Sequence, residues 1–406
     1  MKILIVNKFL YPNGGSETYI FKIGEQLQKM GHDVQYFGME HEGRIVGNHA
    51  ESYTSDMDFH SGKLGKLGKL LYPFKIIYST EARKKIRRVL DDFQPNAVHL
   101  NNFNFQLTPS ILYEIKRYRK DTGRKVRIVF TAHDSQLVCP NHLMQRFITG
   151  EKCTECIGGS PWNCTKYRCI HGSFVKSFLG SVEAWLYRLL KTYRLIDVAI
   201  CPSGFLKDKL DTCPQLRDKT VVMHNFVEKP RQVYEKEKDR PYVIYFGRYS
   251  KEKGIETLVN VCKTLKDIPF VFAGNGPLED EVKAVPNVTE LGFQSGEKLR
   301  ELIGKAMFSV FPSECNENCP FAVMEALSYG TPVIGAAIGG VPELIREGEN
   351  GLLFESGNEK QLEDAIRRLW EDGELRERLT DEYRKTSFDR IEDYCEKLLK
   401  LYRQPE

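Results

Sequence analysis

Residues 2–37 read KILIVNKFLYPNGGSETYIFKIGEQLQKMGHDVQYF, and this stretch holds a strand, a loop, a helix and a second strand in that order. Residues 2–9 form an apolar run typical of a buried strand, and residues 34–37 form another. Between them the apolar residues follow the spacing of one helix face: Ile20, Ile23, Leu27 and Met30. A unit of this kind predicts a parallel sheet covered by helices.

The same alternation recurs along the chain and restarts once. Strand-like runs lie at 96–100, 126–130 and 197–200, and then at 242–246, 270–273, 288–291, 308–311 and 333–334. The length of 406 residues also favours two cores over one. We therefore expect an α/β fold of two Rossmann-like, doubly wound domains that face a cleft.

Composition sets the expected domain boundaries. The N-terminal domain covers 1–227 and contains a cysteine-rich insert near 139–171. Residues 228–241 are charged, flanked by prolines and without periodicity, which predicts a linker. The second domain covers 242–383, and residues 384–406 form a C-terminal helix that crosses back and packs on the N-terminal domain.

Composition also excludes several classes of protein. Hydrophobic residues make up 41% and charged residues 28%, and the net charge of +4 is too small to predict a nucleic-acid partner. The chain has no apolar run of about eighteen residues, so no membrane span is expected. Asn7 and Lys8 interrupt the apolar start, so we expect a cytoplasmic protein. An odd number of cysteines, 11, favours thiols or metal ligands over disulfides.

Two features of the first domain follow predicted strands, where open α/β sheets bind ligands. Gly14 and Gly15 would let a ligand approach the backbone at a helix start, although an ordinary turn with Ser16 as its cap fits equally. The loop has no G-x-G-x-x-G pattern, which argues against a dinucleotide dehydrogenase. His133 lies in Thr131-Ala132-His133-Asp134, at the end of the strand predicted from the run 126–130. It could hydrogen-bond a substrate hydroxyl, although a lone histidine is more often structural.

In the second domain, GRYSKEKG at 247–254 follows the first predicted strand. Arg248 can grip two phosphate oxygens and Lys253 adds a point charge, which together fit a pyrophosphate. The alternative is a pair of solvated cations on a polar loop. Their place at the carboxyl end of a strand favours the functional interpretation.

The stretch SECNENCPFAVMEALSYGTP at 313–332 places two glutamates around a predicted helix start. Pro320 suits the first helical position, Glu317 precedes it, and Glu325 lies inside the helix. The helix start would face an anion, and the carboxylates would accept hydrogen bonds from sugar hydroxyls. For Glu325, a solvated helix face is an equally ordinary explanation.

Two further segments stand apart from these strand ends. The cysteines at Cys153, Cys156, Cys164 and Cys169 have spacing that predicts a structural zinc site, with inert thiols as the alternative. Leucines and lysines interleave from Lys63, and cations continue to Arg88. This basic segment predicts contact with an anionic membrane surface, with a solvated helix face as the alternative.

Together these motifs resemble the retaining GT-B glycosyltransferases of family 4 over nearly the whole chain. Glu317 and Glu325 reproduce the E-x7-E spacing of that family. TPVIGAAIGGVPELI at 331–345 and GENGLLF at 348–354 resemble the closing part of its nucleotide domain. Arg248 and Lys253 match its pyrophosphate positions, while the glycine pair and the histidine match its first loop and cleft: Gly14, Gly15 and His133.

The resemblance implies retaining sugar transfer from a nucleotide-sugar donor, with no cofactor for catalysis. Implied catalytic residues are His133 and Glu317, and implied donor-binding residues are Gly14, Gly15, Arg248, Lys253, Glu317, Asn318 and Glu325. A GT-B nucleotide-sugar epimerase and a non-catalytic sugar-nucleotide sensor are the alternatives.

One departure from the family pattern points to a subfamily. Many relatives have E-G-F-G where this chain has Glu317-Asn318-Cys319-Pro320. Pro320 cannot donate a backbone N–H, so the side chain of Asn318 would supply a donor instead. This form and the cysteine-rich insert resemble transferases of bacterial surface polysaccharides. The implied acceptor is a glycan or a polyprenyl-linked sugar, with the enzyme peripheral on the inner membrane face.

Overall fold

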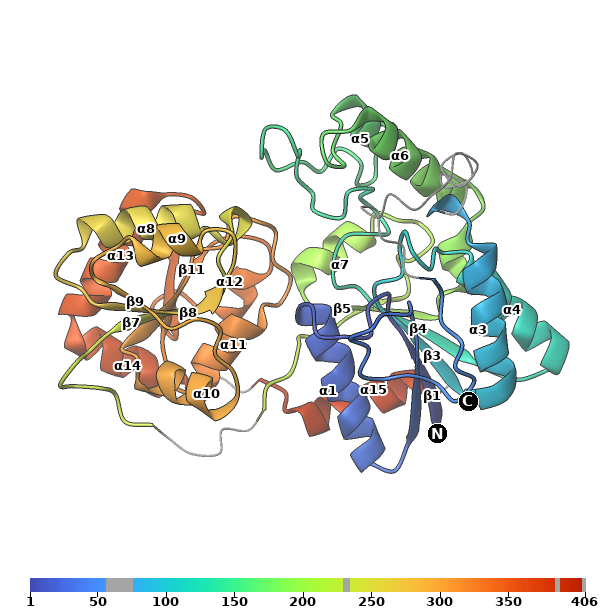
Figure 1. The fold of residues 1–406 in the computed structure, drawn as a ribbon, viewed down its shortest axis with the longest axis horizontal. Coiled ribbons are helices and arrows are strands. Elements are labelled where there is room, and N and C mark those ends of the chain that lie inside the picture. Colours follow the sequence, from blue (N-terminus) through green and yellow to red (C-terminus); the bar gives the residue numbers. More distant parts are fainter. Residues whose placement is uncertain (56–75, 229–233, 384–387, 404–406) are drawn as a thin grey trace. The chain divides into compact units, whose positions relative to one another are not determined.

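The computed structural model describes residues 1–55, 76–228, 234–383 and 388–403. The chain forms two compact units, Met1–Met223 with Ile391–Glu406 as unit 1, and His224–Arg390 as unit 2. Each unit is a parallel sheet with flanking helices, which confirms the predicted α/β fold of two Rossmann-like domains (Figure 1). In the described part of the chain, no helix has the length and apolar character that a bilayer span requires.

The sheet of unit 1 has six parallel strands in the order β2-β1-β3-β4-β5-β6. The strands are β1 (Lys2–Val6), β2 (Asp33–Phe37), β3 (Ala97–Leu100), β4 (Arg127–Thr131), β5 (Val198–Cys201) and β6 (Thr220–Val222). The last residue of β1, Val6, lies in register with Phe37 and Leu100, so the three strands end at one edge. The chain adds β2 on one side of β1 and the later strands on the other, so the strand order reverses between β1 and β3. Open sheets form ligand crevices at such a reversal.

The helices of unit 1 cover this sheet. They are α1 (Gly15–Lys29), α3 (Thr80–Phe93), α4 (Ile111–Thr122), α5 (Trp162–Lys166), α6 (Phe174–Leu189), α7 (Gly204–Leu210) and α15 (Ile391–Tyr402), with a 3-10 turn at Thr192–Leu195. The predicted C-terminal helix therefore starts later than expected, at Ile391. It packs against α1 and β4 because its inward face is apolar and carries two tyrosines.

Those two tyrosines bind α15 to the core of unit 1 through hydrogen bonds. The hydroxyl of Tyr394 lies 2.9 Å from that of Tyr19, and the hydroxyl of Tyr402 lies 2.6 Å from Nδ1 of His99. The Nε2 atom of His99 is 2.8 Å from Oγ1 of Thr131 on β4. The helix that ends the chain is thus part of the buried polar network of the first unit.

The sheet of unit 2 also has six parallel strands, in the order β12-β11-β10-β7-β8-β9. The strands are β7 (Val243–Arg248), β8 (Phe270–Asn275), β9 (Val288–Glu290), β10 (Phe308–Phe311), β11 (Val333–Ala336) and β12 (Gly351–Phe354). This is the strand order of the dinucleotide-binding fold, with its reversal between β7 and β10. The loops after these two strands are therefore the expected ligand position within unit 2.

The helices of unit 2 pack on both sides of that sheet (Figure 1). They are the 3-10 turn η2 (Lys251–Lys253), α8 (Ile255–Thr264), α9 (Glu279–Lys283), α10 (Gly296–Lys305), α11 (Phe321–Ser328), α12 (Val341–Leu344), α13 (Glu359–Glu371) and α14 (Gly373–Tyr383). Their apolar faces and the strands share one continuous core.

The predicted linker at 228–241 differs from the observed boundary, which falls at residue 223. Its described C-terminal part packs on unit 2. The Nζ atom of Lys236 donates to the carbonyl of Gly304 at 3.1 Å and to Oγ1 of Thr331 at 2.8 Å. The ring of Tyr234 lies 6.0 Å from that of Tyr329. These contacts attach the described part of the predicted linker to unit 2, and residues 229–233 lie outside the described residues.

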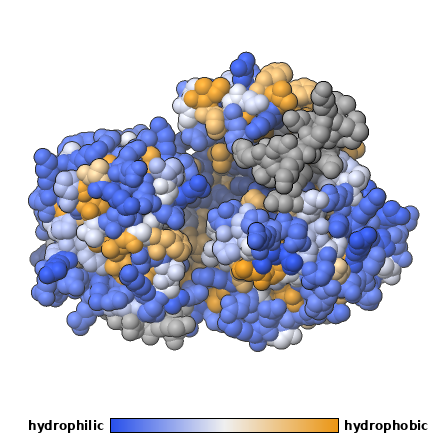
Figure 2. All heavy atoms as spheres, viewed as in Figure 1, coloured by the Kyte–Doolittle hydropathy of each residue, from blue (hydrophilic) through white to orange (hydrophobic). Residues whose placement is uncertain are grey.

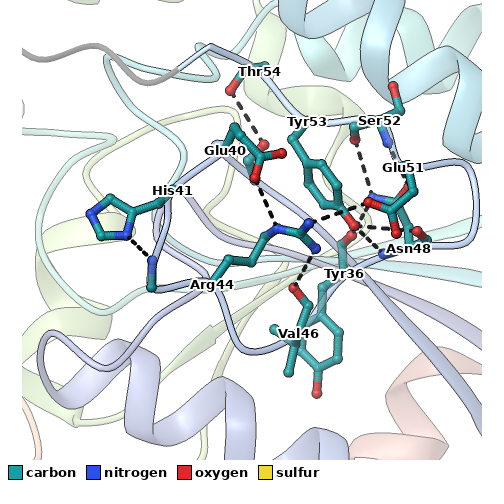
Figure 3. A network of polar contacts seen from close by, with 12 residues as sticks. Tyr36, Glu40, His41, Arg44, Val46, Asn48, Glu51, Ser52, Tyr53 and Thr54 are labelled. Carbon is teal, nitrogen blue, oxygen red and sulfur yellow. Dashed lines mark hydrogen bonds and ion pairs between the residues drawn. The ribbon is translucent and has the colours of Figure 1, made fainter.

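The segment after β2 is a loop held by side chains (Figure 3). The guanidinium of Arg44 lies 3.9 Å from the ring centre of Tyr53 and bonds the carboxylates of Glu40 and Glu51. The amide of Asn48 donates to the carbonyl of Tyr36 at 2.9 Å, which joins the loop to β2. These contacts give residues 39–55 a defined path along the sheet edge.

Candidate functional site

In unit 2 the loop after β7 and the loop after β10 are joined by backbone contacts. The amides of Glu314 and Cys315 both donate to the carbonyl of Glu252, at 3.0 and 3.1 Å. A Cβ at Gly254 would lie 1.9 Å from the carbonyl oxygen of Pro312, and its φ of +71° is left-handed. Only glycine fits at this position. The loop after β7 is thereby packed directly on the loop after β10.

This packing brings together Lys253 and Glu317, which are 64 positions apart in the sequence. The Nζ atom of Lys253 lies 2.6 Å from Oε1 of Glu317, and Oγ of Ser313 donates to the same oxygen at 2.8 Å. Burial opposes the charge of Lys253, but the carboxylate of Glu317 outweighs it and raises the lysine pKa. The site is therefore a charged pair, with 32% of the lysine and 14% of the glutamate side chain exposed.

The backbone of Glu317 is fixed from a third direction by a glycine pair in the IGGVP stretch. The amide of Gly340 donates to the carbonyl of Glu317 at 2.8 Å. Gly339 has a φ of +59°, and a Cβ there would lie 2.0 Å from the same carbonyl oxygen. Sequence reasoning did not assign these glycines or Ser313 a role, although a glycine pair after a strand was a usable signal.

The Asn318-Cys319-Pro320 trio begins helix α11 and is anchored from inside. The backbone amide of Asn225 donates to Sγ of Cys319 at 3.2 Å, and its side chain donates to the carbonyl of Cys319 at 2.7 Å. Pro320 is the residue before the first helical one and not the first itself, a correction by one position. Its carbonyl accepts from the amide of Met324, so its missing N–H costs nothing here. Cys319 is thus a buried anchor for the helix start.

The remaining predicted donor residues lie nearby in the same unit. Arg248 ends β7 and is exposed, and its carbonyl accepts from the hydroxyl of Tyr245 at 2.8 Å. Its guanidinium forms no ion pair within the described residues. Glu325 lies on the second turn of α11 and is half-buried. The structure brings Lys253 and Glu317 into contact.

In unit 1 the loop edge after β1 and β3 is held by asparagines that sequence reasoning missed. The amide of Asn7 donates to Oε1 of Glu17 at 2.8 Å, and its Oδ1 accepts from the backbone amide of Asn102 at 3.0 Å. The side chain of Asn102 donates to Oγ of Ser16 at 3.0 Å. The available signal was a polar residue directly after each apolar strand run.

Close packing does not require glycine at Gly14 or Gly15 in unit 1. Gly14 is the residue before α1 and Gly15 is its first residue, and Ser16 does not cap the helix. A Cβ at Gly15 would meet nothing within 4 Å, and one at Gly14 would meet Oε2 of Glu17 at an ordinary 3.5 Å. The fold would accept a side chain at both positions, so packing does not explain why they are glycines.

His133 follows β4 at the same edge of unit 1. Its Nε2 lies 2.9 Å from Oδ1 of Asn101, whose amide nitrogen donates to the carbonyls of Val6 and His99 at 3.3 Å each. That orientation leaves Oδ1 to accept, so Nε2 of His133 carries the proton. Burial lowers the pKa of His133 to about 4, against a smaller opposite effect of Asp134. The imidazole is therefore a neutral donor and acceptor at neutral pH.

Three of the four cysteines predicted to bind zinc gather in the folded insert. Cys156, Cys164 and Cys169 form one buried cluster, and burial raises the pKa of Cys156 to about 12. Across the described ranges, no group of three or more histidine, cysteine or acidic side chains is arranged to hold a metal ion. The structural zinc site stays a prediction.

Part of the basic segment, residues 63–75, lies outside the described residues. Of the cations that follow, Arg83 lies 2.7 Å from Oε2 of Glu114, and Arg87 lies 2.7 Å from Oδ2 of Asp121. Those two arginines join α3 to α4, and the contact of the basic segment with an anionic membrane stays a prediction. Lys84 and Arg88 are exposed.

Comparison with known protein families covers both units. The family described as Glycosyltransferase Family 4 matches residues 13–231, and the family described as Glycosyl transferases group 1 matches residues 226–386.

Individual relatives match over parts of their length. An uncharacterised glycosyltransferase of Methanocaldococcus jannaschii is 28% identical over 52% of this chain and 60% of that protein. A lipopolysaccharide core biosynthesis glycosyltransferase of Rhizobium meliloti is 24% identical over 52% of this chain and 63% of that protein. The chain thus spans less than two thirds of each of these two relatives.

A solved structure supports the fold over its whole length. HepE of Anabaena in complex with UDP-glucose superposes with a TM-score of 0.65, at 16% identity, over 98% of this chain and 99% of that one. At this identity the likeness concerns the fold alone, which is GT-B.

Proposed function

The chain belongs to glycosyltransferase family 4, and from this premise we propose that it moves a sugar from a nucleotide-sugar donor to a glycan or polyprenyl-linked acceptor. The transfer retains the anomeric configuration and uses no metal ion. The prediction of the family from sequence is confirmed, and the reaction is our proposal.

The pair of Lys253 and Glu317 at the strand reversal of unit 2 carries the proposal. A half-buried ammonium held 2.6 Å from a carboxylate offers a charge to a diphosphate and an acceptor to a sugar hydroxyl in one place. The exposed Arg248 adds a second cation at the end of β7. Helix α11 starts next to Glu317, and its free amides favour an anion.

In the proposed reaction, the bond between the anomeric carbon and the diphosphate oxygen breaks, and the oxygen keeps the electron pair. The acceptor hydroxyl forms the new bond to that carbon, and its proton passes to a diphosphate oxygen. Lys253 and Arg248 stabilise the charge that develops on the diphosphate. His133, neutral at neutral pH, would bond a sugar hydroxyl, and Gly14 and Gly15 would let the substrate approach the backbone.

The expected setting is surface polysaccharide synthesis. The name of the Rhizobium meliloti relative, which refers to lipopolysaccharide core biosynthesis, supports this setting. The UDP-glucose bound by the Anabaena protein supports a nucleotide-sugar donor. We place the protein in the cytoplasm, peripheral on the inner membrane face, with the segment Lys63–Arg88 as one contact with anionic lipid.

A donor screen with a lipid-linked acceptor and product detection tests the proposal. Lys253→Ala and Glu317→Ala should each lower transfer by about 100-fold or more, because a charge-stabilising contact is lost. Lys283→Ala is the matched control, since the Nζ atom of Lys283 forms an exposed ion pair with Oε1 of Glu279, at 2.6 Å. Equal activity of Glu317→Ala and the parent protein would remove the residue from the site. EDTA should leave the initial rate unchanged.

The same assay separates the alternatives. An epimerase would convert the donor without any acceptor, and a sensor would bind the donor without transfer or hydrolysis. Either result, obtained with several donors and acceptors, would overturn the transferase proposal.

A further inference from the structure

Helix α6 of unit 1 is built with its polar side inward. Its buried residues are Ser177, Gly180, Ser181, Glu183 and Tyr187. Its exposed residues include Phe174, Phe178, Trp185 and Leu189, spaced by four, seven and four positions, which is one helix face. A helix on the surface of a soluble domain normally shows the opposite arrangement.

Hydrogen bonds fix this orientation. Oγ of Ser181 donates to the carbonyl of Pro161 at 2.8 Å, and Oγ1 of Thr165 donates to Oγ of Ser181 at 2.7 Å. Oγ of Ser177 accepts from the amide of Ile170 at 3.0 Å. Rotating α6 to hide its aromatic side would break these bonds and bury the partners unsatisfied. These hydrogen bonds therefore keep the apolar face of α6 exposed.

The outward face has apolar neighbours, and Figure 2 shows groups of hydrophobic atoms over this part of unit 1. The ring of Trp162 lies 5.8 Å from Phe178, and Phe174 lies 6.2 Å from Phe178. Ten of the thirteen exposed large apolar side chains in the described part of the chain lie between residues 143 and 190. We call Trp162, Phe174, Phe178, Trp185, Leu189 and Leu190 the insert patch. Concentrations of this kind mark contact with another apolar phase.

Positive charge dominates the stretch that carries the insert patch. Residues 161–195 contain six lysines and arginines and one acid, Glu183, which is 3% exposed and faces inward. The neighbouring acid Glu155 is paired with Arg146. At the end of α6 a cavity of about 290 Å³ has Arg188, Lys191 and Arg194 in its wall and no acidic residue. Arg188 donates to three backbone carbonyls, so no carboxylate neutralises it there. An anionic group suits this cavity.

We propose that the insert patch and this cavity form a docking surface for an anionic membrane. The aromatic and leucine side chains enter the boundary between headgroups and acyl chains, where tryptophan is favoured. Arg188, Lys191 and Arg194 bind lipid phosphates. A bilayer surface supplies both the apolar layer and the continuous negative charge, whereas a protein partner would need an acidic rim around an apolar centre.

This inference deepens the membrane part of the proposed function and moves the contact from α3 to α6. Vesicle binding requires neither donor nor acceptor. A failure of the transfer assay and a failure of the docking surface are therefore separate results.

The test measures binding of the full chain to phosphatidylcholine vesicles with and without phosphatidylglycerol, by sedimentation and tryptophan fluorescence. We expect binding only to the anionic vesicles, weakened by salt. The double variant Phe178→Glu with Trp185→Glu should bind at least about tenfold more weakly. The double variant Lys191→Glu with Arg194→Glu should also bind more weakly and lose most of its salt dependence. Phe293→Glu, at an exposed phenylalanine of unit 2, is the matched control and should bind like the parent.

Four outcomes would overturn the proposal. One is undiminished binding of the α6 variants. Another is loss of binding only in Lys84→Glu with Arg88→Glu, which would return the contact to α3. A concentration-dependent dimer abolished by Trp185→Glu, without vesicle binding, would make a second copy the occupant. A lowered melting temperature for Trp185→Glu, without vesicle binding, would mean that the chain covers the patch itself.

Discussion

At the strand ends of unit 2, Gly254 and Gly339 lie where a carbonyl oxygen would come within 1.9 and 2.0 Å of any Cβ, whereas Gly15 of unit 1 faces open space. The loops of unit 2 are therefore held together by close backbone packing. The loop edge of unit 1 is held by side chains instead, through Asn7 and Asn102. The loops of unit 2 are thus held in position by the chain itself. Beside Gly15 of unit 1 there is space that no group of the chain fills.

The largest expected effect tests the packed loops of unit 2. Gly254→Ala adds a Cβ against Pro312 and forces a left-handed φ on alanine, so the free energy of unfolding should fall by about 3 kcal/mol. Denaturant unfolding measures it. A loss below about 1 kcal/mol would mean that the two loops move apart easily, and that the site is not assembled in advance.

Acid should weaken unit 1 through its buried histidine. Burial, and then the nearby His133, lowers the pKa of His99 to about 3. The unfolded chain binds a proton below about pH 6.5 and the folded one does not, so stability falls as the pH falls. Between about pH 8 and about pH 5 His99 alone should lower stability by about 2 kcal/mol, and His133, whose pKa burial lowers to about 4, adds to the loss.

Thermal unfolding at several pH values measures this effect. In His99→Gln the pH dependence over this interval should shrink, while the parent protein keeps it. An unchanged slope in the variant would assign the acid sensitivity to other groups.

A smaller effect concerns the ion pair of Lys253 and Glu317 in unit 2. Ser313→Ala removes one of the three hydrogen bonds that Oε1 of Glu317 accepts, from Lys253, Ser313 and Cys315, so kcat/KM should fall by about fivefold to tenfold. Stability should change by less than about 1 kcal/mol, because Lys253 still neutralises the carboxylate. Steady-state kinetics and unfolding are measured on the same preparation. A larger loss of stability than of activity would make Ser313 a structural residue.

The smallest expected change in stability is at Gly15. Gly15→Ala starts α1 with a better helix former and meets no neighbour, so the free energy of unfolding should stay within about 0.5 kcal/mol. The rate of transfer should nevertheless fall, because the new methyl group occupies the space left for substrate. Unchanged activity together with unchanged stability would mean that the open glycine of unit 1 has no role.

Several features of the fold could be predicted because they depend on local pattern. Apolar runs of strand length recur with helical spacing between them, and this alternation is readable without knowing any contact. The E-x7-E spacing and the cations after β7 were likewise readable in the sequence. Residues 308–311 were predicted as a strand, and β10 covers the same residues.

Other features could not be read from the sequence, because they depend on which segments meet. The spacing of the cysteines does not show that Cys156, Cys164 and Cys169 gather in one buried cluster. Arg83 and Arg87 belong to the basic segment, and the acids that bind them come from α4. Lys236 lies in the predicted linker, and its contacts with Gly304 and Thr331 join residues far apart in the chain.

By itself, the sequence determined the order of strands and helices, the family, and the residue types at the strand ends, because these depend on local periodicity and short motifs. Tertiary structure alone decided which side chains meet. Lys253 meets Glu317 because β7 and β10 are neighbours in the sheet, 64 positions apart in the chain. It also decided that α6 turns its aromatic side outward, since helical spacing marks a face but not its direction.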